Sequence, residues 1–177
     1  IQIRTNDSSP YSLDFKDGEF FISENGDPIA RKIYFDPKPK WYDMKFEDGT
    51  PVPAVVQGFS GEYMFITINR YCELWNKGGR CRFCDMNTNF QSQRAGEEDV
   101  VARLEPNMLA EALKLAINVD SRYRLAVVIT GGTILGKYRG QTEIEFYCSR
   151  LHAMREKLQA WIPSTFQIDP QDDEGWK

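Results

Sequence analysis

The sequence predicts an α/β fold over residues 58–177, preceded by a β-rich N-terminal extension over residues 1–57. In the larger part, apolar runs of strand length alternate with longer segments whose apolar residues recur every three or four positions. The strand candidates are 63–68, 125–129 and 165–168, and the helix candidates are 106–119 and 142–158. This alternation is typical of a parallel sheet or a (β/α) barrel. The extension contains turn dipeptides and prolines but no helical periodicity.

The composition indicates an ordinary globular protein. With 177 residues, of which 41% are hydrophobic, the chain is long enough to bury a core of its own. The formal net charge of -4 gives no electrostatic support for nucleic-acid binding. No apolar run approaches the roughly 20 residues of a membrane span, and no signal peptide is visible. We therefore expect neither a nucleic acid nor a membrane as partner.

The extension reads as β structure with tight turns. Turn dipeptides at Asp17-Gly18 and Asn25-Gly26 flank the apolar run Phe20-Phe21-Ile22, a hairpin pattern. The prolines that follow, in PKPK at 37–40 and at positions 51 and 53, argue against helix. The extension contains no constellation of acids, thiols or bases, so we expect it to pack on the core or to recruit a partner.

The first strand and helix of the larger part have clear signals. Residues 63–68, YMFITI, are rich in aromatic and β-branched side chains, which favour strands. In 106–119, Pro106 suits the first turn of a helix. The apolar side chains of this helix share one face at i, i+3, i+4, i+7 and i+8: Leu109, Ala112, Leu113, Ala116 and Ile117. The next strand, 125–129, is continuously apolar, as strands buried on both faces are.

The second helix candidate begins with a capping-box pattern, Thr142-Glu-Ile-Glu145, and ends before Pro163. A further strand candidate, 165–168, follows it. Two βα units are too few to close a barrel, and the chain begins at Ile1 instead of a methionine. We therefore expect a piece of a longer polypeptide, truncated at its C-terminus.

Three of the four cysteines lie together in one short segment. Cys72, Cys81 and Cys84 form C-x8-C-x2-C directly after the strand 63–68, while Cys148 lies apart in the second helix. A tight cluster of this kind is not a disulfide framework, so we expect metal or cofactor ligation in a reducing compartment, the cytoplasm. Three thiolates can hold three irons of a [4Fe–4S] cluster and leave the fourth iron open to a ligand.

A glycine turn follows the next strand. Gly131-Gly132-Thr133 comes after 125–129, and adjacent glycines allow close backbone approach and expose peptide groups to a ligand. Because the carboxyl ends of parallel strands share one edge, we expect this turn and the cysteine segment to form one site.

With these two motifs the sequence resembles the radical S-adenosylmethionine enzymes. In that superfamily three cysteines after the first barrel strand hold a [4Fe–4S] cluster, usually as C-x3-C-x-Φ-C with Φ aromatic. Cys81-Arg82-Phe83-Cys84 matches the second half of this motif, with Phe83 as the aromatic residue. Gly131-Gly132-Thr133 stands where the family has a Gly-Gly-Glu-like turn. The first cysteine gap is eight residues instead of three, and Thr133 replaces the usual acid.

The resemblance implies a partial or full radical-SAM-type (β/α) barrel and an oxygen-sensitive enzyme. Cys72, Cys81 and Cys84 would ligate the cluster, Phe83 would pack near the cluster or the adenine, and Gly131-Gly132-Thr133 would contact S-adenosylmethionine. Reductive cleavage to methionine and a 5′-deoxyadenosyl radical would then start hydrogen abstraction from a substrate. The implied partners are a one-electron donor such as flavodoxin or ferredoxin and an unidentified substrate, for which a protein or peptide is one option. No catalytic residue can be named.

A non-catalytic, zinc-stabilised binding module is the alternative. Zinc requires a fourth ligand, and the sequence offers Cys148 and the single histidine, His152, both in the second helix candidate. Neither shows the paired spacing of a zinc ribbon or finger. We expect Cys148 to be a buried structural thiol and His152 to be a surface or packing residue.

Overall fold

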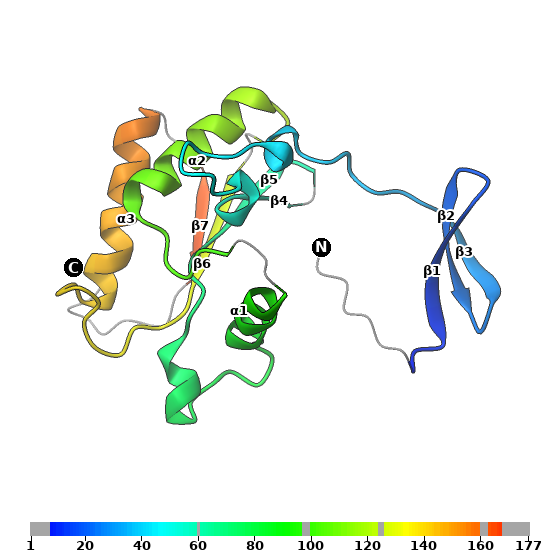
Figure 1. Ribbon diagram of the computed structural model, residues 1–177, viewed down its shortest axis with the longest axis horizontal. Helices are drawn as coiled ribbons and strands as arrows, with labels where there is room; N and C mark the ends of the chain where they lie inside the picture. The colour runs from blue at the N-terminus through cyan, green and yellow to red at the C-terminus, as the bar shows by residue number, and fades with distance from the viewer. Residues whose placement is uncertain (1–7, 60, 97–99, 124–125, 160–162, 168–177) are drawn as a thin grey trace. The chain divides into compact units, whose positions relative to one another are not determined.

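The computed structural model describes residues 8–59, 61–96, 100–123, 126–159 and 163–167. The chain divides into two compact units, Ile1–Pro37 and Lys38–Lys177 (Figure 1). Each unit has its own sheet, and the two are described separately below. Within the described residues, no helix combines the length and the apolarity needed to cross a bilayer.

The smaller unit is an antiparallel three-stranded sheet. Its strands, in the order β1-β2-β3, are β1 (Tyr11–Lys16), β2 (Glu19–Glu24) and β3 (Asp27–Ile33). The two predicted turns are confirmed: Asp17 and Gly18 have φ of 53° and 82°, and Asn25 and Gly26 have φ of 52° and 92°. Positive φ at both central residues is the geometry that joins twisted strands in two-residue hairpins.

The larger unit contains a four-stranded sheet and three α-helices. Its strands are β4 (Gln57–Phe59), β5 (Tyr63–Asn69), β6 (Ala126–Gly131) and β7 (Ser164–Gln167), its α-helices are α1 (Met86–Ala95), α2 (Pro106–Val119) and α3 (Glu143–Leu158), and its 3₁₀ helices are η1 (Lys40–Asp43), η2 (Val52–Ala54) and η3 (Glu73–Lys77). The sheet order is β4-β5-β6-β7, with β5, β6 and β7 parallel and β4 antiparallel. The sheet is open in the described residues, so the barrel stays a prediction.

The predicted helices and strands of this unit are confirmed where they are described. Residues 125 and 168, which end two of the predicted strands, lie outside the described residues. The capping box of α3 forms as expected, because the Glu145 amide bonds to the Thr142 side chain and the Glu145 carboxylate accepts from the Thr142 amide. Gln159 ends α3 in a left-handed conformation before Pro163 is reached.

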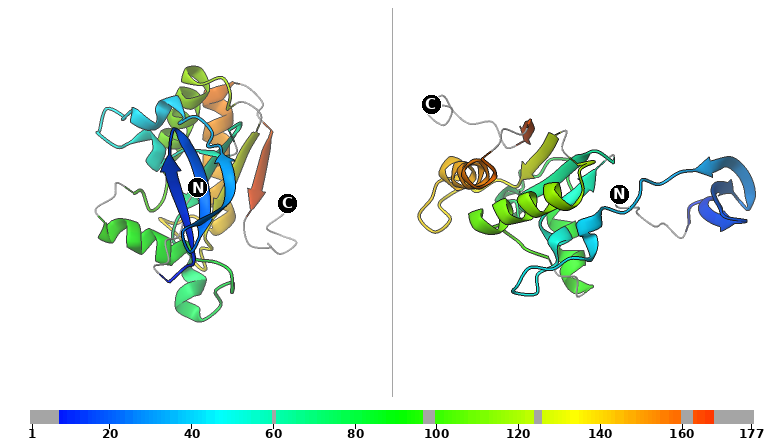
Figure 2. Two further views of the ribbon diagram at one scale, coloured as in Figure 1. Left: turned by 90° about the vertical axis from the view of Figure 1, so that its right-hand side faces the viewer. Right: turned by 90° about the horizontal axis from the view of Figure 1, so that it is seen from above.

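The helices α2 and α3 cover one face of the sheet (Figure 2). The connections β5–α2–β6 and β6–α3–β7 cross the sheet in the same direction, so right-handed crossovers place both helices on one side. The core lies between these layers and contains apolar side chains from both: Met64, Ile66, Ile68, Leu109, Leu113, Val127, Ile129 and Phe146.

The opposite face of the sheet is only half-buried, which corrects the expectation for the strand at 125–129. Val127 and Ile129 are buried beneath the helices, but Val128 and Thr130 are half-exposed on the other face. The Thr130 hydroxyl lies 3.4 Å from that of Thr67 on β5. The strand is apolar throughout, yet helices cover it on one side in the described residues.

The boundary between the units lies earlier than the expected position after residue 57. Residues 38–56 contribute fully buried side chains to the core of the larger unit, among them Trp41, Val52 and Val56. The Trp41 indole N–H donates to the Val56 carbonyl over 2.9 Å, and its ring packs edge-on against Tyr123 at 4.7 Å. Apolar burial therefore assigns this proline-containing segment to the larger unit.

Candidate functional site

The segments after β5 and β6 meet at the carboxyl edge of the parallel strands. Asn69, the last residue of β5, pairs with Gly131, the last residue of β6. The Gly132 amide donates to the Asn69 carbonyl over 2.9 Å, and Cys72 follows three residues after Asn69. The cysteine segment and the glycine turn therefore lie next to each other, as expected for two neighbouring parallel strands.

Close packing explains both glycines of the turn. A β-carbon on Gly132 would lie 2.7 Å from Cα of Cys72 and 2.8 Å from its amide nitrogen. A β-carbon on Gly131 would overlap the side chain of Tyr147 in α3. The backbone of Cys72 can reach the end of β6 because Gly132 has no side chain.

The peptide groups of Gly132 are bonded within the protein. Its carbonyl accepts from the Asn69 side-chain amide and from the Tyr147 hydroxyl, each over 2.7 Å. Two donors occupy both lone pairs of a carbonyl oxygen. The sequence predicts that the turn offers its peptide groups to a ligand, but those of Gly132 hold β5, β6 and α3 together. Asn69, fully buried at the end of an apolar strand, is a residue that sequence reasoning missed.

Glu73 makes a second connection between the two segments. Its amide donates to the Thr133 carbonyl over 2.9 Å, and its carboxylate accepts from the Leu135 amide over 2.9 Å. Arg103 approaches the other carboxylate oxygen at 3.5 Å. Thr133 itself is buried, with 7% of its surface exposed. The sequence carried no signal for Glu73 beyond its position next to Cys72.

Cys72 is also held from the side of α1. The Cys72 amide donates to Oδ1 of Asn87 over 2.8 Å, and Nδ2 of Asn87 donates to the Cys72 carbonyl over 3.0 Å. Asn87 lies in the first turn of α1, three residues after Cys84, and is 3% exposed. No spacing in the sequence marks Asn87 as a partner of Cys72.

The other two cysteines lie on a more open turn. Cys81 is exposed and Cys84 is half-buried, and the Cys84 amide donates to the Cys81 carbonyl over 3.1 Å. Phe83 between them is 91% exposed. Within the described part of the chain, no three Cys, His, Asp or Glu side chains are arranged to hold a metal ion. The structure fixes Cys72 beside Gly132 but does not gather the three thiols.

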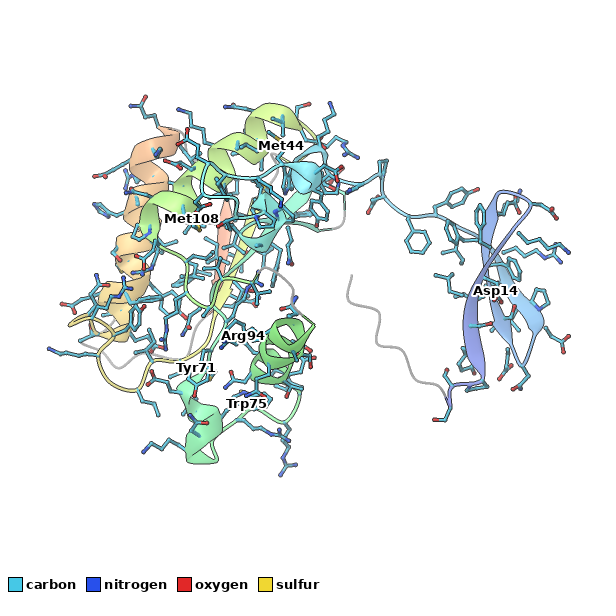
Figure 3. All side chains as sticks on the ribbon, viewed as in Figure 1. Asp14, Met44, Tyr71, Trp75, Arg94 and Met108 are labelled. Atoms are coloured by element: carbon cyan, nitrogen blue, oxygen red, sulfur yellow. The ribbon has the colours of Figure 1, made fainter. Side chains whose placement is uncertain are left out.

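Aromatic and cationic side chains surround the cysteine segment. Figure 3 labels Tyr71 and Trp75 on the segment that connects β5 to α1. The Arg80 guanidinium lies 5.0 Å from the Trp75 ring, and that of Arg103 lies 4.3 Å from the Tyr138 ring. Nε1 of Trp75 and Nε of Arg103 are buried without a hydrogen-bond partner in the described structure.

The two candidates for a fourth zinc ligand lie elsewhere. Cys148 and His152 are both on the exposed side of α3, whose buried side chains include Phe146 and Met154. The expectation of a buried Cys148 is wrong, because this position falls outside the apolar stripe of the helix. His152 is a surface residue, which is one of the two places expected for it.

The chain is similar to one curated enzyme. It is 31% identical over 108 residues to bacteriochlorophyllide c C-7(1)-hydroxylase from Chlorobaculum limnaeum. The match covers 57% of this chain and 26% of the relative, so the chain spans about a quarter of the relative's length. No protein-family model matches the chain, and no solved structure matches it.

Proposed function

We propose that this chain provides the cofactor-binding segments of a radical S-adenosylmethionine enzyme. The observation that carries the proposal is the position of the three-cysteine segment. It starts at the carboxyl end of β5, and the backbone of Cys72 packs directly on the glycine turn after β6. Active sites of α/β proteins lie at this edge. The similarity to the hydroxylase is consistent with an enzymatic role.

The three thiols match a [4Fe–4S] cluster with one open iron in ligand type, although the described structure does not gather them. Cys72, Cys81 and Cys84 are three soft thiolate ligands, the kind that iron–sulfur clusters select. Cys72 is fixed by its neighbours, whereas Cys81 is exposed and Cys84 is half-buried on the turn before α1. When bound and reduced, the cluster would supply the electron that cleaves S-adenosylmethionine to methionine and a 5′-deoxyadenosyl radical.

The chain's own contribution is to position these groups. Gly131-Gly132-Thr133 would line the side of the site next to Cys72, with Thr133 in the place of the family's acid. The buried Nε1 of Trp75 would be a donor for a cluster sulfide or a cofactor oxygen. The half-exposed face of the sheet, with Phe65, Thr67 and Thr130, would form part of the inner wall of a partial or full barrel.

Substrate and partners follow from the proposed reaction. A one-electron donor such as flavodoxin or ferredoxin would reduce the cluster, which requires the reducing conditions of the cytoplasm. The name of the relative describes hydroxylation at a carbon, and removal of hydrogen from a carbon–hydrogen bond would begin such a reaction. We extend only this reaction class to the present chain and propose no specific substrate.

The test is an anaerobic reconstitution with Fe²⁺ and sulfide, followed by dithionite and S-adenosylmethionine. We expect iron and acid-labile sulfide in about equal amounts, as in a [4Fe–4S] cluster, and formation of 5′-deoxyadenosine. Cys84→Ala should lose both the cluster and the product. Cys148→Ala is the matched control, because it removes an exposed thiol from α3 and should change neither.

Two results would contradict the proposal. A chain that binds zinc with high affinity and takes up no iron would be the zinc-stabilised module, and Cys84→Ala should then unfold the surrounding segment, because structural zinc contributes folding free energy. A chain that holds the cluster but never forms 5′-deoxyadenosine would be an iron–sulfur protein without the proposed cleavage.

A further inference from the structure

The side chain of Asn87 bonds to both polar groups of the Cys72 backbone. It accepts from the Cys72 amide at 2.8 Å and donates to the Cys72 carbonyl at 3.0 Å. A carboxamide can make this pair of bonds because it carries an acceptor and a donor on one rigid plane. A side chain that is only 3% exposed, with both ends bonded to one residue, fixes the position and orientation of that residue.

This contact joins the two ends of the cysteine segment. Asn87 lies 15 residues after Cys72 but three after Cys84, and the intervening turn carries the exposed Cys81. Helix α1 starts at Met86, directly after Asp85, so a shift of Asn87 also moves Cys84. Phe90, one turn later and 8% exposed, anchors the same side of α1. Asn87 therefore sets the separation between Cys72 and the start of the helix that follows Cys84.

We propose that Asn87 is a positioning residue for the iron–sulfur site: it holds Cys72 in place before metal binds and ties Cys84 to it. This inference rests on the proposed function, since it assigns Asn87 a role toward the cluster. Gly132 and Asn87 hold the Cys72 backbone from two sides, from β6 and from α1. Cys81 and Cys84 would then close over a group whose location Cys72 has already fixed.

The experiment compares four variants of the full chain with the wild type. Asn87→Ala removes both hydrogen bonds to Cys72. Asn87→Asp keeps an acceptor for the Cys72 amide but has no N–H to donate to the Cys72 carbonyl. Asn89→Ala removes the same type of side chain two positions along α1, and Leu113→Ala creates a core cavity by truncating a fully buried side chain of α2. Three quantities are measured: amide exchange at Cys72 in the metal-free protein, the rate of iron release from the reconstituted protein to a chelator, and the midpoint of thermal unfolding.

We expect amide exchange at Cys72 to be faster in Asn87→Ala than in the wild type. Iron release should be faster by about 10- to 100-fold, if the loss of metal affinity that follows from removing a group that orients a metal ligand is expressed in the release rate. For Asn87→Asp both rates should lie between those of the wild type and Asn87→Ala, and for Asn89→Ala both should match the wild type. Leu113→Ala should lower the unfolding midpoint without changing iron release, which separates positioning from general stability.

The inference is overturned if Asn87→Ala releases iron at the wild-type rate, or if Leu113→Ala releases it as fast as Asn87→Ala does. If Asn87→Ala does not fold, Asn87→Asp decides in the same way. If the wild type takes up no cluster, the proposed function fails and the inference fails with it. If the wild type and Asn87→Ala both take up the cluster and release iron at the same rate, the role of Asn87 is contradicted but the proposed function is not.

Discussion

The backbone of Cys72 lies directly against Gly132: a β-carbon at Gly132 would be 2.7 Å from Cα of Cys72. Real β-carbons do not approach backbone atoms this closely, so alanine at this position requires one of the two segments to move. Gly132→Ala should lower the free energy of unfolding by about 1–3 kcal/mol, the usual cost of overpacking. Denaturant unfolding measures the loss.

Gly136→Ala is the matched control for this substitution. A β-carbon at Gly136 meets no atom within 4 Å, and its φ is not in the left-handed region. We expect its stability to remain within about 0.5 kcal/mol of the wild type, as for other surface substitutions. Equal losses in the two variants would show that the contact with Cys72 does not constrain the turn.

Asp120, at the end of α2, should make the stability of the larger unit sensitive to acid. Hydrogen bonds from the Arg122 side chain, at 2.9 Å and 2.6 Å, hold the pKa of this buried carboxyl far below its usual value, despite the opposing effect of burial. In the unfolded chain the Asp120 carboxylate is protonated as the pH falls through about 4, whereas in the folded chain it stays ionised to a lower pH. The stabilisation is therefore complete above that pH and is lost as the pH falls below it.

Asp120→Asn should remove this charge-assisted pair. We expect a loss of about 1.5–3 kcal/mol at neutral pH, the range for hydrogen bonds to charged groups. The variant should also lose less stability than the wild type between neutral pH and pH ~3, because one carboxyl with a depressed pKa is missing. Urea unfolding at the two pH values measures both effects, and an unchanged acid dependence would refute the assignment.

The capping box of α3 should contribute to stability through the Thr142 side chain. Thr142→Ala leaves the Glu145 amide without its capping partner and should cost about 1 kcal/mol. Thr142→Ser keeps a hydroxyl at the same place and should recover most of the loss. Thermal unfolding of the two variants provides the comparison, and equal midpoints for alanine and serine would mean that the cap is not stabilising.

The position of the unit boundary predicts the outcome of two truncations. A chain beginning at Lys38 retains Trp41, Val52 and Val56 and should keep the cooperative unfolding of the larger unit. A chain beginning at Gly58 lacks these buried side chains and should lose it, because removing one large core side chain alone costs about 3–5 kcal/mol. Near-UV circular dichroism and thermal unfolding would detect the difference. Equal stability of the two truncated chains would show that residues 38–57 are not part of the larger unit's core.

Much of the fold could be predicted because its signals are local. The apolar stripes of α2 and α3, the capping residues Thr142 and Glu145, and the two hairpin turns depend on neighbours within a few positions. The burial of residues 38–56 could not be predicted in this way. Its prolines indicate irregular backbone, and only the tertiary contact of Trp41 with Tyr123 and Val56 reveals a core segment.

For the candidate site, too, the sequence predicted some residues and missed others. Cysteine spacing singled out Cys72, Cys81 and Cys84, and strand order placed the first of them beside the glycine turn. The polar residues that hold this arrangement, Asn87 and Glu73, bond across 15 and about 60 residues, and no spacing rule finds such pairs. The joint ligation of a cluster by the three cysteines stays a prediction.

The packing of Cys72 and Tyr147 on the two glycines bears on how this chain would change over evolutionary time. A larger residue at Gly131 or Gly132 is excluded by neighbouring protein atoms, so purifying selection would act on both positions whether or not a cofactor is bound. A descendant that had exchanged its thiols for serines, and with them the proposed cofactor site, would still retain the pair. In comparisons among distant homologues, the glycines would therefore trace common ancestry, and the cysteines would trace the proposed function.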